Sequence, residues 1–130
     1  MSLVAVNLRT IALVQGLYYG LTGLWAVLDI QSFQLVTGPK ADLWLVKTVG
    51  LLVLVVGIVL VTAGLRQRLA LETVLLGSGC CLVLAWVSAW YALKGVIAPI
   101  YLLDALLELL LAFFWVRGWL VRKGSRIPHR

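Results

Sequence analysis

Two carboxylic acids lie inside a strongly apolar stretch near the end of the chain, residues 101–115. Asp104 and Glu108 are four residues apart, so on a helix they occupy one face, one turn from each other. Tyr101 and Trp115 belong to the same stripe. An ionised carboxyl group in hydrocarbon is strongly unfavourable unless it finds a partner, water or a proton. The chemistry open to this pair is therefore proton exchange or the binding of a polar group in apolar surroundings.

The composition indicates the setting in which these acids lie. The chain has 130 residues, of which 63% are hydrophobic and 12% are charged, whereas a soluble domain is about half apolar and a quarter charged. The apolar runs have the length of helices. We predict an all-α integral membrane protein, a four-helix transmembrane bundle of up-down-up-down topology. The predicted helices are 8–30, 42–64, 69–93 and 97–121 in a single domain, 1–121, followed by a basic cytoplasmic tail, 122–130.

Polar residues on the other helices are the expected partners of the acids. A rise of 1.5 Å per residue places Lys47 level with Asp104, and Glu108 level with Tyr18 and Tyr19. We expect an outward-opening cavity with its floor at Glu108. Lys47 either pairs with Asp104 or extends to the headgroups. The candidate ligand or proton site comprises Gln15, Tyr18, Tyr19, Thr22, Asp29, Lys47, Tyr101, Asp104 and Glu108.

Glu108 lies among leucines near the expected midplane, with no basic residue at its level. Desolvation disfavours the charged form, so we expect a largely protonated acid that is hydrogen-bonded by Tyr18 or Tyr19 together with Thr22. Three interpretations of the polar group remain open. It is a small-molecule or proton site, an interhelical clamp, or a polar face that meets another protein.

Small residues recur on the first two predicted helices at helical spacing. Such stripes let neighbouring backbones approach closely, so we predict that these two helices pack through them. The predicted packing positions are Gly16, Gly20, Gly23, Gly50, Gly57 and Gly64.

Several classes of function have no support in the sequence. No hydrolase, zinc-protease or nucleotide-binding motif is present, and the single histidine, His129, lies in the tail. We therefore expect no enzyme activity, metal or cofactor. The adjacent Cys80 and Cys81 are interpreted as packing residues, since a bridge between neighbours is strained. The net charge is +6, but the basic residues gather at helix ends, which favours anionic lipid over nucleic acid as the partner.

The layout resembles that of DoxX-like small bacterial membrane proteins. The similarity rests on four helices in about 130 residues, on the glycine-rich first helix (Gly16, Gly20, Gly23), and on the run 36–47. It implies no particular activity. Our leading functional prediction is a small membrane protein that binds a lipid-like or amphipathic small molecule in an acid-lined intramembrane cavity. The alternatives are a homo-oligomeric, proton-coupled transporter or channel that uses Glu108, and a structural or accessory subunit.

The distribution of basic residues predicts a multi-pass protein of the inner or plasma membrane with both termini in the cytoplasm. With four crossings, three lysines fall on the outer side, Lys40, Lys47 and Lys94. Eight basic residues fall on the inner side: Arg9, Arg66, Arg68, Arg117, Arg122, Lys123, Arg126 and Arg130.

This orientation can be measured with single-cysteine variants in which Cys80 and Cys81 are first replaced by alanine. A cysteine at position 38 should react with an impermeant maleimide added outside intact cells, and a cysteine at position 67 should react only after the cells are opened. Labelling of position 38 from the cytoplasmic side alone would reverse the assignment.

Overall fold

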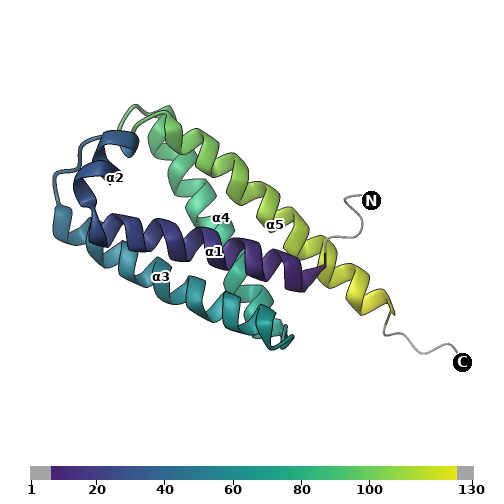
Figure 1. The fold of residues 1–130 in the computed structure, drawn as a ribbon. Coiled ribbons are helices and arrows are strands. Elements are labelled where there is room, and N and C mark those ends of the chain that lie inside the picture. Colours follow the sequence, from purple (N-terminus) through teal and green to yellow (C-terminus); the bar gives the residue numbers. More distant parts are fainter. Residues whose placement is uncertain (1–6, 126–130) are drawn as a thin grey trace, which may run out of the picture.

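The computed structural model describes residues 7–125, and within this range helices are the only regular secondary structure. Its helices are α1 (Leu8–Leu28), α2 (Ile30–Thr37), α3 (Leu43–Leu65), α4 (Leu71–Leu93) and α5 (Ile100–Ser125) (Figure 1). Three helices of the described chain, α1, α3 and α4, are long and apolar enough to cross a membrane. The all-α class is therefore confirmed, and these three helices could cross a membrane, which suggests a membrane protein. The fourth predicted span, α5, is the longest helix but carries Asp104, Glu108 and Arg117.

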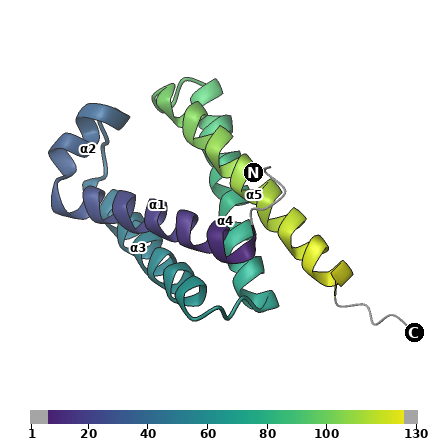
Figure 2. The same ribbon diagram turned by 45° about the vertical axis from the view of Figure 1, so that its right-hand side comes forward.

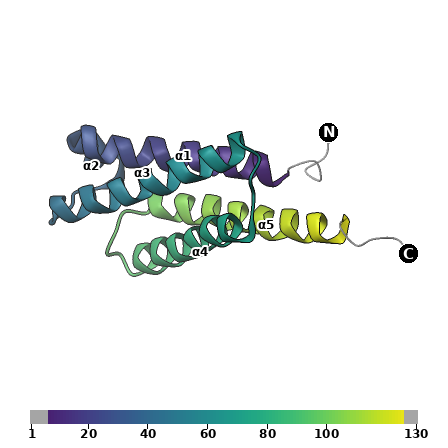
Figure 3. The ribbon, with the colours of Figure 1, turned by 90° about the horizontal axis from the view of Figure 1, so that it is seen from below.

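The long helices form two antiparallel pairs that lie in two layers (Figure 3). α1 packs along α3, and α4 packs along α5. Between the layers, α1 contacts α5, whereas α3 and α4 contact each other little although they are consecutive in the chain. The start of α1, the α3–α4 link and the end of α5 lie at one end of the molecule (Figures 1 and 3). α2 and the α4–α5 link lie at the other end, where the two pairs diverge (Figure 2).

The first predicted helix is shorter than expected, and the expected loop after it contains a helix. α1 ends at Leu28 because Asp29 leaves the helical conformation, with φ −141° and ψ 72°. The Asp29 carboxylate then accepts a hydrogen bond from the Ser32 amide at 3.2 Å, which caps the start of α2. Trp25 donates from Nε1 to the Ser32 hydroxyl at 2.7 Å, and its ring meets Phe33 edge-on. These contacts fold α2 back against the end of α1.

The remaining boundaries agree with the prediction within a few residues. α3 begins at Leu43, one residue later than predicted, and the side chain of the preceding Asp42 makes no capping hydrogen bond. Glu72 lies in the first turn of α4, where a carboxylate suits the helix dipole. α5 starts directly after Pro99 and continues to Ser125, so residues 122–125 of the predicted tail are helical. Residues 126–130, which include His129, lie outside the described range.

Glycines bring α1 and α3 into backbone contact, as predicted. A Cβ atom on Gly57 would lie 2.6 Å from the Gly20 amide nitrogen and 2.7 Å from the Gly16 carbonyl oxygen. A Cβ on Gly23 would collide with the Gly50 carbonyl oxygen, and one on Gly16 would lie 2.8 Å from the backbone nitrogen of Val61. Gly20 itself differs, because a Cβ there would meet nothing within 4 Å. The backbone of Gly20 takes part in the contact, but its side-chain position faces open space.

Because of this difference between Gly57 and Gly20, we expect substitutions at the two positions to have opposite effects on stability. Gly57→Ala places a methyl group against backbone atoms that cannot move aside, and overpacking of this kind costs about 1–3 kcal/mol. Gly20→Ala meets no neighbour and removes a helix-interior glycine, so it should be neutral or stabilising by up to about 1 kcal/mol. Unfolding of both variants in the same detergent would measure the difference. Equal stability of the two would mean that α1 and α3 do not pack as described.

Candidate functional site

Three levels of hydrogen bonds connect α1, α4 and α5, and we call them together the polar ladder. Each level joins one side chain of α1 to one residue of α4 and one residue of α5. The three levels are Gln15 with Gly77 and Trp115, Tyr19 with Cys81 and Glu108, and Tyr18 with Asp104 and Ser88.

The first level is a fully buried amide. Gln15 donates from Nε2 to the Gly77 carbonyl oxygen at 3.0 Å, and its Oε1 accepts a hydrogen bond from the Trp115 indole. Both Gln15 and Trp115 are completely shielded from solvent. The Trp115 ring lies so close to Gly77 that a Cβ there would be 2.5 Å from it. Because both ends of the amide are engaged, Gln15 serves here as a crosslink among three helices.

The second level contains the buried acid. The Tyr19 hydroxyl donates to Glu108 Oε2 at 2.8 Å, and the Cys81 sulfur lies 3.9 Å from the same hydroxyl. Glu108 is only 1% exposed. No basic side chain of residues 7–125 forms an ion pair with it. The predicted tyrosine partner of Glu108 is therefore present, and it is Tyr19.

The third level holds the second acid nearer the α2 end of the molecule. Tyr18 donates its hydroxyl hydrogen to Asp104 Oδ1, and Ser88 donates to Oδ2 at 3.1 Å. Asp104 is half-buried. One turn earlier on α5, the Tyr101 ring has the Lys40 ammonium 5.2 Å from its centre, a cation–π distance. Both carboxyl groups thus receive hydrogen bonds from hydroxyl groups.

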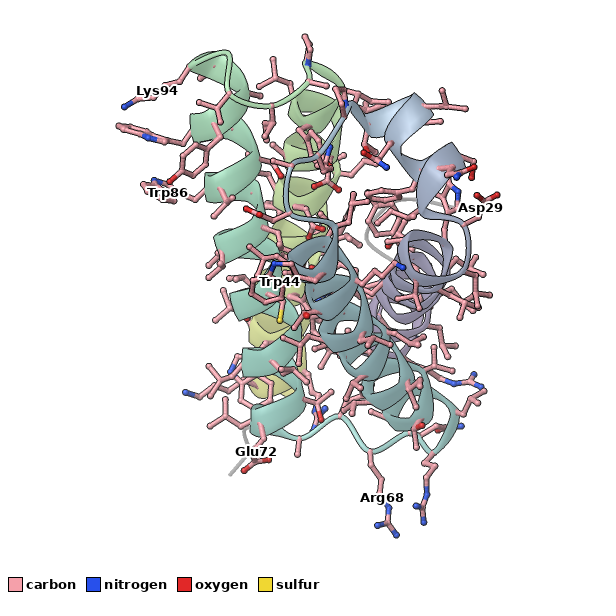
Figure 4. All side chains as sticks on the ribbon, turned by 90° about the vertical axis from the view of Figure 1, so that its left-hand side faces the viewer. Asp29, Trp44, Arg68, Glu72, Trp86 and Lys94 are labelled. Atoms are coloured by element: carbon pink, nitrogen blue, oxygen red, sulfur yellow. The ribbon has the colours of Figure 1, made fainter. Side chains whose placement is uncertain are left out.

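Four predicted site residues lie outside the ladder, Tyr101 and the three described here, so the expected outward-opening cavity above Glu108 does not form. The Thr22 hydroxyl donates to the Tyr18 carbonyl oxygen of its own helix at 2.7 Å and does not reach Glu108. Asp29 caps α2 at the periphery of the molecule (Figure 4). Lys47 is exposed, and the partners of Asp104 are Tyr18 and Ser88, so the first of the two alternatives for Lys47, pairing with Asp104, is wrong. Ser88 occupies the place that we expected Lys47 to fill.

Sequence reasoning missed the contribution of α4 to the ladder. Gly77, Cys81 and Ser88 are separated by four and seven residues, a spacing that places them on one helical face. All three are buried on that face. The sequence alone indicates only close packing for such residues, because small residues suit tight helix contacts whether or not they also form hydrogen bonds. The spacing of four and seven residues was the feature of the sequence that could have indicated a shared polar face on α4.

A groove runs between α3 and α4, where these helices contact each other little. Its volume is about 450 Å³, within the usual range of ligand pockets. The residues that line it are Tyr19, Val49, Leu52, Val53, Val56, Leu75, Leu76, Gly79, Cys80, Val83 and Leu84. Neither acid lines the groove. Glu108 lies behind Tyr19, whose ring borders the groove while its hydroxyl bonds the carboxyl group.

A second cavity of about 510 Å³ lies at the α2 end, between the α2–α3 and α4–α5 links. Its only charged lining residue among those described is Lys40. The Lys40 ammonium already donates to the Thr37 and Gly38 carbonyl oxygens at 3.0 and 2.9 Å. This ammonium group therefore holds the α2–α3 link together and is not free to bind a ligand.

No protein-family model, curated protein or solved structure matches this chain. The similarity to DoxX-like proteins accordingly stays a prediction, and the site stands on its geometry alone. Within residues 7–125, no group of three or more His, Cys, Asp or Glu side chains is arranged to hold a metal ion.

The ladder predicts unequal effects for two hydroxyl deletions on α1. Tyr19→Phe removes the hydrogen-bond donor to a buried acid, and leaving such a group unsatisfied costs about 1–3 kcal/mol. Thr22→Val removes a hydroxyl that only bonds its own helix, so it should change stability by less than about 0.5 kcal/mol. Denaturant unfolding in lipid–detergent micelles would compare them. A loss for Thr22→Val as large as that for Tyr19→Phe would contradict the assigned partners.

Proposed function

We propose that this chain is a small four-span protein of the inner or plasma membrane that binds a lipid-like or amphipathic molecule in the groove between α3 and α4. The fourth span is α5. Its two acids are directed into the polar ladder, whereas its leucines at 102, 103, 106, 107, 109 and 110 are exposed. An outer face of this kind suits contact with lipid. The excess of basic residues at the inner end supports cytoplasmic termini.

The observation that carries the proposal is the chemistry along the groove. Apart from Tyr19 and Cys80, its lining is entirely aliphatic or glycine, so it suits a hydrocarbon chain. At Tyr19 the groove meets the first polar group of the ladder. At 1.5 Å per residue, lining positions 75–84 of α4 extend over about 13 Å. An elongated molecule with an apolar chain and one polar end matches this arrangement.

A second candidate function, proton-coupled transport at Glu108, has one specific observation in its favour. Glu108 is fully buried without a basic partner in the described chain, and isolated acids of this kind are used as proton carriers in membrane transporters. The same residue therefore serves either proposal. Occupation of the groove is the property that separates them.

Photo-crosslinking can test groove binding with two neighbouring positions on α4. A fatty alcohol with a photoreactive diazirine in its chain should label peptides that cover residues 49–56 and 75–84 in lipid nanodiscs. Val83→Trp fills the groove and should reduce this labelling at least about threefold, an energetic change below 1 kcal/mol. Leu82→Trp is the matched control, because Leu82 is also exposed but does not line the groove.

Two outcomes would count against binding in the groove. One is labelling spread evenly over all the exposed apolar faces, including residues 102–110 of α5. The other is an equal response to Val83→Trp and Leu82→Trp. Either would mean that the groove holds only ordinary surrounding lipid, and it would favour a structural or accessory role.

A further inference from the structure

We infer that the amphiphile bound in the groove carries a cationic amine head, which passes Tyr19 and pairs with Glu108. This inference rests on the proposed function and names the chemical class of the ligand. It starts from two acids inside the bundle that have no basic partner among the described residues, so a cationic head would supply the charge that stabilises the ionised form of Glu108. Asp104 and Glu108 lie one turn apart on α5, and no Lys or Arg side chain of residues 7–125 pairs with either of them.

The donors that surround the acids are all uncharged. Asp104 has two hydroxyl donors, Tyr18 and Ser88, one on each carboxyl oxygen. Glu108 has one hydroxyl donor, Tyr19, and the Cys81 sulfur lies 3.9 Å from the same hydroxyl. Asp104 thus has a hydroxyl donor on each oxygen, whereas Glu108 has a hydroxyl donor on Oε2 alone among the described residues. Of the two acids, Glu108 is the one left to accept from a ligand.

The path from the groove leads to Glu108 and not to Asp104. Tyr19 borders the groove and bonds Glu108 directly, whereas Tyr18, Ser88 and Asp104 do not line it. Rotation of the Tyr19 side chain would open the groove onto the carboxyl group.

The alternatives fit this end of the groove less well. A carboxylate or phosphate head would bring a second negative charge beside two acids, and like charges at this distance in apolar surroundings repel strongly. A hydroxyl head could replace the Tyr19 hydrogen bond but would add no charge to balance Glu108. An ammonium head supplies both donors and charge, and charge-assisted hydrogen bonds are about twice as strong as neutral ones.

Three probes with the same chain test the inference in nanodiscs of uncharged phosphatidylcholine, with empty nanodiscs as the reference for partition into lipid. Dodecylamine, dodecanol and dodecanoate would each compete against the photoreactive fatty alcohol for labelling of residues 75–84. We expect dodecylamine to compete at a concentration at least about tenfold lower than dodecanol, the ratio for one additional charge-assisted bond. Dodecanoate should compete least.

Glu108→Gln should lower the amine-to-alcohol ratio to about one, because the amide keeps the size and hydrogen bonding of the acid without its charge. Glu72→Gln is the matched control. It removes the same charge from an exposed position in the first turn of α4, so it should leave the ratio unchanged. A fall of the ratio with Glu72→Gln would assign the preference to the overall charge of the protein and overturn the role of Glu108.

The outcomes separate the inference from the proposed function. Competition by dodecanol equal to that by dodecylamine in the wild-type protein overturns the amine preference and leaves groove binding intact. If none of the probes competes for labelling that Val83→Trp reduces, groove binding is overturned, and the inference is overturned with it. The wild-type comparison decides the matter even if Glu108→Gln does not fold.

Discussion

The buried hydrogen bond from the Tyr19 hydroxyl to Glu108, 2.8 Å long, joins the two halves of the molecule at the level of its most deeply buried acid. An apolar bundle has no water with which to satisfy a carboxyl group, so the group must find its partner on a neighbouring helix. Gln15 at one level and Tyr18 at the next meet the same requirement. Within residues 7–125, no deeply buried side-chain nitrogen or oxygen atom lacks a hydrogen-bond partner.

Two kinds of contact join α1 to the other long helices. α1 and α3 meet through glycine backbones, a contact of shape that requires no polar group. α1 meets α4 and α5 through the polar ladder, a contact that requires complementary donors and acceptors. α3 has no part in the ladder, and it contacts α4 little. Neither the glycine contacts nor the polar ladder joins α3 to α4, and this explains why a groove lies between these two helices.

The position of Tyr19 connects the architecture to the proposed function. Its ring belongs to the wall of an apolar groove, and its hydroxyl belongs to the ladder. A molecule in the groove would thus meet the structural network of the protein at one residue. The carboxyl group that would recognise a polar head also takes part in the hydrogen bonds that stabilise the bundle. We therefore expect ligand binding and interhelical packing to be coupled.

The helical class, the approximate bounds of four long helices and the glycine contact between the first two could all be predicted from the amino-acid sequence. These properties depend on hydropathy and spacing along one segment, which can be counted without knowledge of its neighbours. The sequence also singled out Gln15, Tyr18, Tyr19, Asp104 and Glu108 as polar residues in apolar helices. The pairing of these side chains depends on how the helices pack, and the fold places Ser88, and not Lys47, beside Asp104. Neighbouring residues on a helix point about 100° apart. The choice of Tyr19 for Glu108 and Tyr18 for Asp104 therefore depends on how α1 is rotated against α5, and residue spacing within a helix does not contain that rotation.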